Sequence, residues 1–293
     1  MTLDLAHLSS EARLLSLEAS EARIRFIQEA RWISHARAQR VLEELEWRLA
    51  HPVCSRMPCL LVYGDSGIGK TMVIEKFTRQ NAARTYDAHN GVQKRAILTV
   101  QMPPSPDERR FYAKILESLH APFSPSARLV ALETIALRLL RKIELKMLVI
   151  DEVHQMLAGT YREQRRALNL LKSLTNELLI PVVAVGTEDA LHALQTDPQV
   201  ASRFDPIRLA RWTESEAFRN FLVAFGKLLP LRKASPFGDR DMIRLVLARS
   251  DGITARVTRL ITRAAAESIL DGTECIDVAR VDSISKRVLP DAA

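Results

Sequence analysis

The sequence predicts an α/β fold: a five-stranded parallel sheet, preceded by a helical segment and followed by a helical lid. Short apolar runs recur through the middle of the chain, as expected of parallel strands buried on both faces. Helical patterns separate these runs and fill both ends of the chain. We therefore expect three parts: a helical leader (1–52), an α/β core (53–212) and a C-terminal helical lid domain (213–293).

The leader is helical in pattern from residue 9 to residue 50. This stretch contains no Gly or Pro and repeats apolar residues at helical spacing, and His51-Pro52 ends it. The pattern fits a helical hairpin packed on the domain that follows. It also fits a docking arm for a partner protein.

The first strand candidate, Cys59–Tyr63, runs into a glycine-rich turn. Residues 60–71 read LLVYGDSGIGKT and match G-x-x-x-x-G-K-[ST], the pattern of a phosphate-binding loop. Glycines allow backbone N–H groups to surround phosphate oxygens, the following helix directs its positive end at them, and the Lys adds a cation. The strand, loop and helix follow in the order that this reading requires. The predicted nucleotide-binding residues are Gly64, Asp65, Ser66, Gly67, Ile68, Gly69, Lys70 and Thr71, whose hydroxyl would face Mg²⁺.

A second signal comes at the end of a later strand. Strand candidate Ala96–Gln101 leads through a Pro-rich loop to helical patterns at 108–119 and 127–142, and the apolar run Met147–Asp151 follows. An acid at the carboxyl end of a strand beside a phosphate loop can hold Mg²⁺, and we assign Asp151 to this role. Glu152 would be the general base that activates water.

His154 completes the run D-E-V-H, which suggests a helicase. The Ser-Ala-Thr motif that such a helicase needs occurs nowhere in the chain, so we expect His154 to cap a helix instead.

The next strand candidate, Pro181–Thr187, follows a long amphipathic helix within residues 157–180. Thr187 would contact the γ-phosphate or the attacking water. Alternatively, it merely caps the helix that begins at Glu188.

Arg203 precedes the fifth strand candidate, 206–212. An Arg at this rim can reach the nucleotide of a neighbouring subunit and stabilise transition-state charge. A surface ion pair explains it equally well.

The lid begins at Thr213–Glu216, which reads as a capping box. Residues 214–290 predict a bundle of about four helices, interrupted at Asp251-Gly252 and Asp271-Gly272. Arg256 could reach the phosphates of its own subunit.

Composition narrows the class of protein. Lys and Arg exceed Asp and Glu by 42 − 35 = 7, and the pI is about 9.5, which favours a polyanionic partner. No apolar run approaches the ~20 residues of a membrane span, and the first residues lack a signal-peptide pattern. We expect a cytoplasmic protein without membrane contact. The three cysteines, Cys54, Cys59 and Cys275, form no C-x-x-C pair and are expected to be small buried side chains.

The order of these features resembles the AAA+ ATPases, and in detail the TniB family of transposition proteins, relatives of the TnsC regulators and more distantly of the IstB ATPases. Four stretches carry this resemblance: RMPCLLVYGDSGIGKT (56–71), KMLVIDEVHQMLAGT (146–160), QRRALNLLKSLTNELLIPVVAVGTEDA (164–190) and DPQVASRFDPIRLARW (197–212). The leader segment RWISHARAQRVLEELEWRL (31–49) also resembles that family.

This resemblance implies a bacterial ATPase that regulates the target site of a mobile element. With ATP and Mg²⁺ bound it would polymerise on double-stranded DNA as a homo-oligomer or helical filament. It would recruit a TniA-like transposase and a TniQ-like target-selection protein, and release DNA on hydrolysis. ATP is favoured over GTP by the resemblance, and the chain has no N-K-x-D motif for guanine.

The cations that would contact DNA are expected in the part of initiator-like ATPases that lines the central channel. A solvated helix face is the alternative for each of them. The candidates are Lys94, Arg95, Arg109, Arg110, Arg138, Arg141 and Lys142.

Two other functions stay open. An IstB-like or helicase-loader ATPase would remodel a partner protein, and would lack the long helical leader. A nucleotide-gated scaffold would bind ATP without needing turnover, and Glu152 argues against it because a scaffold has no need of a general base.

Overall fold

The computed structural model describes residues 4–29, 31–82, 86–87, 92–105 and 107–288. Its contacts divide the chain into two compact units. The core unit comprises residues 37–65 and 70–209, and the lid unit comprises residues 1–36, 66–69 and 210–293. Each unit has its own apolar core.

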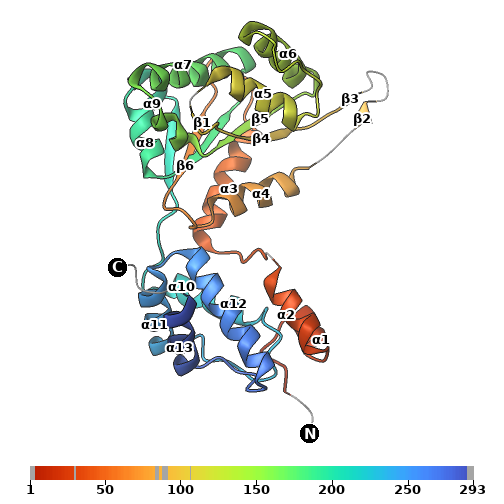
Figure 1. Cartoon of the computed structure of the whole chain (residues 1–293), viewed down its shortest axis with the longest axis vertical. Helices are drawn as coiled ribbons and strands as arrows, with labels where there is room; N and C mark the ends of the chain where they lie inside the picture. The colour runs from red at the N-terminus through yellow and green to blue at the C-terminus, as the bar shows by residue number, and fades with distance from the viewer. Residues whose placement is uncertain (1–3, 30, 83–85, 88–91, 106, 289–293) are drawn as a thin grey trace. The chain divides into compact units, whose positions relative to one another are not determined.

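A parallel sheet organises the core unit (Figure 1). Its strands lie in the order β4-β5-β6-β1-β7, and every neighbouring pair is parallel. The five-stranded parallel sheet expected from the sequence is therefore confirmed. The strands are β1 (Cys59–Tyr63), β4 (Ile97–Gln101), β5 (Met147–Asp151), β6 (Val182–Gly186) and β7 (Phe204–Arg208).

The expected fifth strand is displaced, because β7 begins at Phe204 and ends at Arg208. Pro206 therefore lies inside it, paired with Leu61. Proline is tolerated here because β7 is an edge strand, whose outer N–H groups need no partner. Residues 209–212 leave the sheet.

Helices cover the sheet and supply most of the apolar core around it. One short antiparallel pair, β2 (Tyr86–Asp87) with β3 (Val92–Gln93), was not expected. The helices of the core unit are α3 (Ala36–Leu49), α4 (Lys70–Gln80), α5 (Glu108–Ser118), α6 (Leu129–Lys142), η1 (Val153–Ala158), α7 (Tyr161–Leu178), α8 (Glu188–Gln195) and α9 (Pro198–Ala201).

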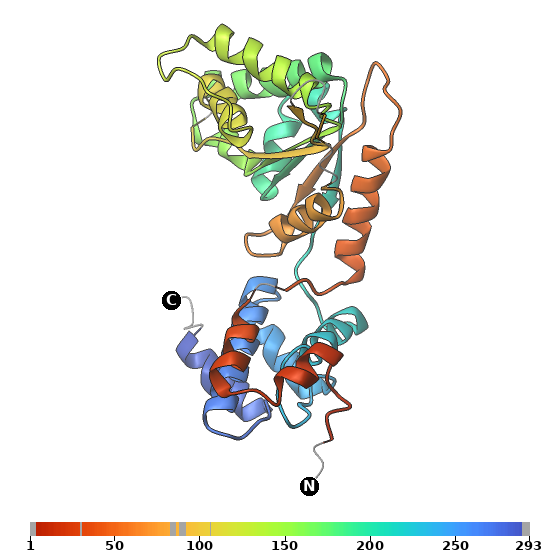
Figure 2. The ribbon, with the colours of Figure 1, turned by 90° about the vertical axis from the view of Figure 1, so that its right-hand side faces the viewer.

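The described residues of the lid unit form helices and connecting loops, without a strand. Four helices follow residue 214, as expected: α10 (Glu216–Gly226), α11 (Arg240–Ser250), α12 (Thr254–Leu270) and α13 (Val278–Val288). The leader helices α1 (Ser10–Leu15) and α2 (Ser20–Gln28) belong to the same unit, and α2 packs on α12 (Figure 1; Figure 2).

The leader is thus not a hairpin packed on the domain that follows it in sequence. Arg23 of α2 is 1% exposed and donates to the Pro230 carbonyl at 3.0 Å and to Glu274 at 2.9 Å, both in the lid unit. The helix α3 packs instead with the core unit, where buried Arg48 pairs with Asp205 of β7 at 2.7 Å.

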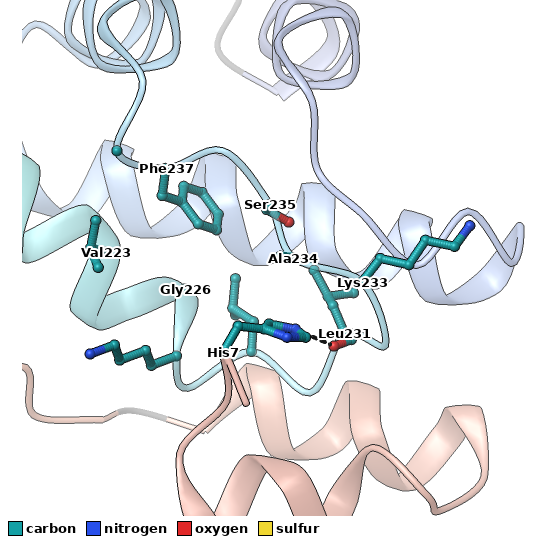
Figure 3. Close-up of a pocket in the computed structure, with 11 residues that line it drawn as sticks. His7, Val223, Gly226, Leu231, Lys233, Ala234, Ser235 and Phe237 are labelled. Atoms are coloured by element: carbon teal, nitrogen blue, oxygen red, sulfur yellow. Dashed lines mark hydrogen bonds between the residues drawn. The ribbon is translucent and has the colours of Figure 1, made fainter. Parts of the chain in front are cut away.

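The start of the chain also lines a small cavity of about 150 Å³ in the lid unit (Figure 3). His7 Nε2 lies 3.1 Å from the Leu231 carbonyl oxygen at one wall. A Cβ at Gly226 would collide with the ring of Phe237 on the other side, so this helix end requires glycine. The contact between His7 and Leu231 links residues near the N-terminus to the loop after α10.

Two smaller expectations were wrong. The N-cap of α10 is Ser215, whose Oγ accepts from the Phe218 N–H at 3.3 Å, and Thr213 forms no capping box. Cys59 is buried, and burial raises the pKa of its thiol to about 11, but Cys54 and Cys275 are only half-buried. Across the described ranges, no helix is both long and apolar enough to span a membrane.

Candidate nucleotide site

The predicted phosphate loop connects β1 to α4. Gly64, Gly67 and Gly69 all have positive φ, at 152°, 75° and 107°. L side chains rarely adopt such values, so the loop needs glycine at these positions. The resulting curl is the backbone geometry in which N–H groups can converge on an anion.

Lys70 is the first residue of α4 and only 7% exposed. Its Nζ donates to the carbonyl oxygens of Gly64 at 2.8 Å and Asp65 at 2.9 Å. Burial lowers the pKa of this ammonium group. No carboxylate in the described part of the chain lies within ion-pair distance of it, but the charges of Asp151, Glu152 and Asp65 partly offset the effect of burial on this pKa.

Thr71 and Asp151 lie together at the carboxyl edge of the sheet. The Thr71 Oγ1 donates to Asp151 Oδ2 at 3.1 Å, and the Glu152 N–H donates to Asp151 Oδ1 at 2.8 Å. Asp151 is 4% exposed. A hydroxyl and a carboxylate are hard oxygen donors of the kind that Mg²⁺ prefers, so the donor set fits this ion. Both residues line a cavity of about 440 Å³ between α4 and β4.

Glu152 follows directly in the left-handed conformation, with φ 57°. Its Oε2 lies 3.3 Å from Nε2 of His154, so His154 does not cap a helix as expected. His154 Nδ1 is buried and has no hydrogen-bond partner among the residues that the structure describes. A Cβ at Gly186 would lie 3.4 Å from that nitrogen, so the imidazole sits between Glu152 and the end of β6.

Thr187 comes directly after β6, whose neighbours in the sheet are β5 and β1. Since parallel strands end at the same edge, Thr187 lies at the edge that carries the loop and Asp151. It occupies the N-cap position of α8 without a side-chain cap hydrogen bond. Its Oγ1 donates to Asp189 Oδ2 at 3.4 Å.

Arg203 precedes β7 and therefore lies at the opposite edge of the sheet, the amino ends of the strands. Its Nη1 donates to Thr175 Oγ1 and Asn176 Oδ1 at 2.7 Å each. The fold thus separates Arg203 from the loop of its own subunit.

Arg256 lies on α12 in the lid unit and pairs with Asp251. Residues 66–69 of the loop group with the same unit. The Ala255 N–H donates to the Gly67 carbonyl at 2.9 Å, and the Thr254 hydroxyl donates to the Ile68 carbonyl at 3.0 Å. Arg256 therefore follows directly after a residue that contacts the loop.

The basic residues expected to contact DNA differ in their partners. Lys94 pairs with Glu144 at 2.6 Å and Arg141 with Glu177 at 3.1 Å. Three arginines donate hydrogen bonds to nearby groups. Arg95 donates to the carbonyls of Ile97 and Ser118, and Arg109 donates to the carbonyls of Pro125 and Ala127. Arg110 donates to the Ser105 hydroxyl. Arg138 and Lys142 are exposed on α6, without an ion pair in the described ranges.

Sequence reasoning missed the contact between His154 and Glu152. The signal was present, because a His two residues after the expected base lies within side-chain reach of it. A helix cap was preferred because His154 was expected to precede a regular helix, whereas η1 is a short 3₁₀ segment that begins at Val153.

Several solved structures share this architecture. The Orc1 protein of Aeropyrum pernix in complex with DNA is 18% identical, with a TM-score of 0.67, covering 90% of this chain and 69% of that one. Cdc6p from Pyrobaculum aerophilum is 16% identical, with a TM-score of 0.68 and coverage of 92% and 72%. The RuvB Holliday junction branch migration motor of Thermotoga maritima is 15% identical, with a TM-score of 0.52 and coverage of 90% and 73%. The fold is therefore that of the AAA+ ATPases.

No curated protein matches the chain. The model of one protein family, described as bacterial TniB protein, matches residues 23–214. This match spans more than half of the sequence and includes the phosphate loop, Asp151, Glu152 and Arg203. The chain belongs to the TniB family.

Proposed function

We propose that this protein is an ATP-dependent, DNA-binding regulator of transposition. It assembles on target DNA when ATP is bound, recruits the transposase, and is released on hydrolysis. The observation that carries the proposal is the pairing of the phosphate loop with Asp151 and Glu152 at one edge of the sheet, through the Thr71–Asp151 hydrogen bond of 3.1 Å. A chain that only bound nucleotide would not need the second acid.

In this proposal the loop glycines and Lys70 hold the phosphates of ATP. Thr71 and Asp151 hold Mg²⁺, which neutralises charge on the β- and γ-phosphate oxygens when bound. The Lys70 Nζ, which donates to two loop carbonyls, has a third hydrogen for a phosphate oxygen.

Hydrolysis needs a base and a group that orients the γ-phosphate. Glu152 accepts the proton of the attacking water, and Thr187 lies at the same edge to contact the γ-phosphate or that water. Arg256 reaches the phosphates of its own subunit, supported by the contact of its neighbour Ala255 with Gly67.

The position of Arg203 supports assembly. Because it lies at the edge opposite the loop of its own subunit, in this proposal it serves the nucleotide of another subunit. ATP between subunits then links nucleotide state to assembly, since the γ-phosphate adds contacts in one state only. A homo-oligomer or filament on double-stranded DNA results.

The partners follow from the family and from the charge of the chain. A net charge of +7 favours DNA, and the solved Orc1 relative is a complex with DNA. A TniA-like transposase and a TniQ-like target-selection protein are the proposed protein partners. We assign partner docking to residues 1–52, hydrolysis to 53–212 and nucleotide sensing to 213–293.

The test is fluorescence anisotropy of labelled duplex DNA titrated with protein in ATP plus Mg²⁺, in ADP, and without nucleotide, at two salt concentrations. Cooperative, salt-sensitive binding that requires ATP is expected. Binding that ignores the nucleotide, or no binding, would contradict the proposal and favour an IstB-like or helicase-loader ATPase.

A Glu152→Gln variant separates the switch from a passive scaffold. We expect it to assemble on DNA with ATP, to lose turnover by about 10²–10⁴-fold, and to lose target discrimination. Unchanged discrimination would show that hydrolysis is incidental.

A further inference from the structure

The first two turns of α7 present three arginines on one face. Arg162, Arg165 and Arg166 are spaced i, i+3 and i+4, which places them side by side on a helix, and all three are exposed. The opposite face of α7 is buried in the core of the unit through Ala167, Leu168, Leu170, Leu171 and Leu174. We call the three arginines the α7 basic face.

The charges of this face have no ion-pair partner among the described residues. Arg165 donates to the Tyr161 hydroxyl at 3.3 Å, with its guanidinium carbon 5.9 Å from the ring centroid. The nearest acid on the helix, Glu163, is engaged elsewhere: its Oε2 accepts from the Thr160 N–H at 2.7 Å and from the Thr160 hydroxyl at 2.8 Å.

Arg166 lies near two carboxylates without pairing to either. Burial raises the pKa of Glu108 on α5, and Arg166 partly offsets this. Hydrogen bonds from Thr160 lower the pKa of Glu163, with a smaller contribution from Arg166. Both effects are long-range, so the guanidinium group itself is available to another molecule.

This face differs from most of the cations expected to contact DNA. Lys94 and Arg141 already pair with acids, and Arg95 and Arg109 already donate to main-chain carbonyls. Moving these side chains to a phosphate would break existing bonds. The α7 basic face can bind a phosphate without that loss.

We infer that the α7 basic face binds the phosphate backbone of duplex DNA. This assignment rests on the proposed function. Guanidinium groups bind phosphate through paired N–H donors, and three of them within two helical turns match a polyanion of closely spaced charges. Tyr161, 71% exposed beside Arg165, adds a hydroxyl donor and an apolar surface for the sugar. An acidic peptide is the other partner that such a face could take.

The position of the face also connects it to hydrolysis. The six-residue segment η1 joins Glu152 to the start of α7, and η1 packs on α7. DNA that restricts the motion of the first turn of α7 should therefore also restrict η1, which follows Glu152 and contains His154. DNA bound at this face should stimulate turnover.

The test compares two variants of the full chain that each remove three charges. The first is Arg162→Gln, Arg165→Gln and Arg166→Gln. The matched control is Arg40→Gln, Arg128→Gln and Lys146→Gln, three residues of the core unit outside the expected DNA-contacting set, whose side chains are also exposed and without an ion pair in the described ranges. Anisotropy is measured in ATP plus Mg²⁺ across a salt series. Melting temperature and binding of a fluorescent ATP analogue establish that each variant is folded.

We expect the α7 variant to weaken DNA binding by about tenfold or more, to lower the slope of log K against log salt by about 3, and to lose DNA stimulation of turnover. The control should retain most of the affinity and slope. Arg→Lys at the same three positions should restore binding, because a phosphate contact needs the charge.

The outcomes separate this inference from the proposed function. If the unaltered protein does not bind DNA with ATP, both are overturned. If it binds, and the α7 variant keeps its affinity and slope, only the assignment of the face is overturned, and competition by poly-glutamate then tests an acidic partner. The assignment is equally overturned if the control loses as much as the α7 variant.

Discussion

The Arg23–Glu274 pair of the lid unit and the candidate nucleotide site of the core unit both bury charged side chains, but they satisfy them differently. The core unit also holds one buried, ion-paired arginine, Arg48. In the lid unit, Arg23 and Glu274 are 1% and 7% exposed and neutralise each other. The Pro230 carbonyl and the Arg232 N–H complete their hydrogen bonds. In the core unit, Lys70 and Asp151 are 7% and 4% exposed, yet neither has an ion-pair partner among the described residues.

This difference distinguishes a structural charge from a functional one. A buried ion costs several kcal/mol unless an opposite charge and hydrogen bonds compensate it. The Arg23–Glu274 pair is compensated within the chain, so its role is to hold α2 on the lid. Lys70 and Asp151 have hydrogen bonds and only longer-range carboxylate or ammonium charges near them, as expected where a phosphate and a cation supply the closer countercharges.

The largest effect is expected at Arg203, a core-unit charge held only by the neutral side chains of Thr175 and Asn176. Arg203→Ala should lower kcat by 10³-fold or more, the range of an arginine that acts on a transferring phosphoryl group. Nucleotide affinity should change only a few-fold. Steady-state ATPase assays with DNA present measure both.

A mixing experiment tests whether this arginine acts between subunits. Lys70→Ala protein cannot bind ATP but supplies Arg203, whereas Arg203→Ala protein binds ATP without supplying the arginine. Mixed, the two inactive proteins should recover part of the activity. No recovery would place Arg203 outside the active site and return it to a surface role.

The next effect contrasts the buried charges of the two units directly. Arg23→Met leaves buried Glu274 with only the longer Arg232 ion pair of 3.9 Å and should lower the free energy of unfolding by about 3 kcal/mol. The double variant Arg23→Met, Glu274→Leu should recover most of this loss. Urea denaturation followed by circular dichroism measures it.

Lys70→Met should behave in the opposite way. Because Lys70 is buried without a carboxylate at ion-pair distance in the described residues, its removal should leave stability unchanged or slightly raised while abolishing nucleotide binding. A loss of stability as large as that of Arg23→Met would show that Lys70 is a structural charge like Arg23.

The pH dependence of stability tests how the charge of Glu274 contributes to the lid unit. Burial alone would raise the pKa of Glu274, but hydrogen bonds from Arg23 and the Arg232 N–H outweigh it and hold the pKa below the ordinary 4.5. The carboxylate therefore contributes stability above about pH 4.5, and this is lost as the pH falls through the folded-state pKa.

The melting temperatures of the unaltered protein and Glu274→Gln, compared at pH 7 and at pH 4 and below, check this. We expect the advantage of the unaltered protein to shrink as the solution becomes more acidic. An advantage that stays constant would mean that the charge of Glu274 contributes nothing.

The features predictable from sequence are local ones. Unbroken apolar runs located β1, β4, β5 and β6, and G-x-x-x-x-G-K-T located the loop, because both patterns depend on neighbouring residues. The missed features depend on distant partners. Arg23 reads as a surface charge on an amphipathic helix until Glu274, 251 residues away, accepts from it. Lys94 and Arg141 read as free cations until Glu144 and Glu177 are brought to them.

The N-cap of α10 and the start of β7 were predicted wrongly because neighbouring residues fit either position equally well. Thr213 and Ser215 are both good caps, and only the course of the chain after β7 decides between them. Pro206 marked the start of a strand in the sequence, although the edge position of β7 lets the strand begin before it.

The smallest effect tests His154, the imidazole that lies 3.3 Å from Glu152 and carries an unpartnered Nδ1. If it orients the base, His154→Ala should lower kcat by up to about tenfold with KM unchanged, less than the 10²–10⁴ that a general base itself contributes. His154→Gln, whose Nε2 can take the position of the imidazole Nε2, should retain most of the activity. Unlike Arg23→Met, neither change should lower the melting temperature by more than a few degrees, because the lost nitrogen at Nδ1 made no hydrogen bond. A stability loss with unchanged kcat would instead make His154 a packing residue between Glu152 and Gly186, with a structural role like that of the Arg23–Glu274 pair in the lid unit.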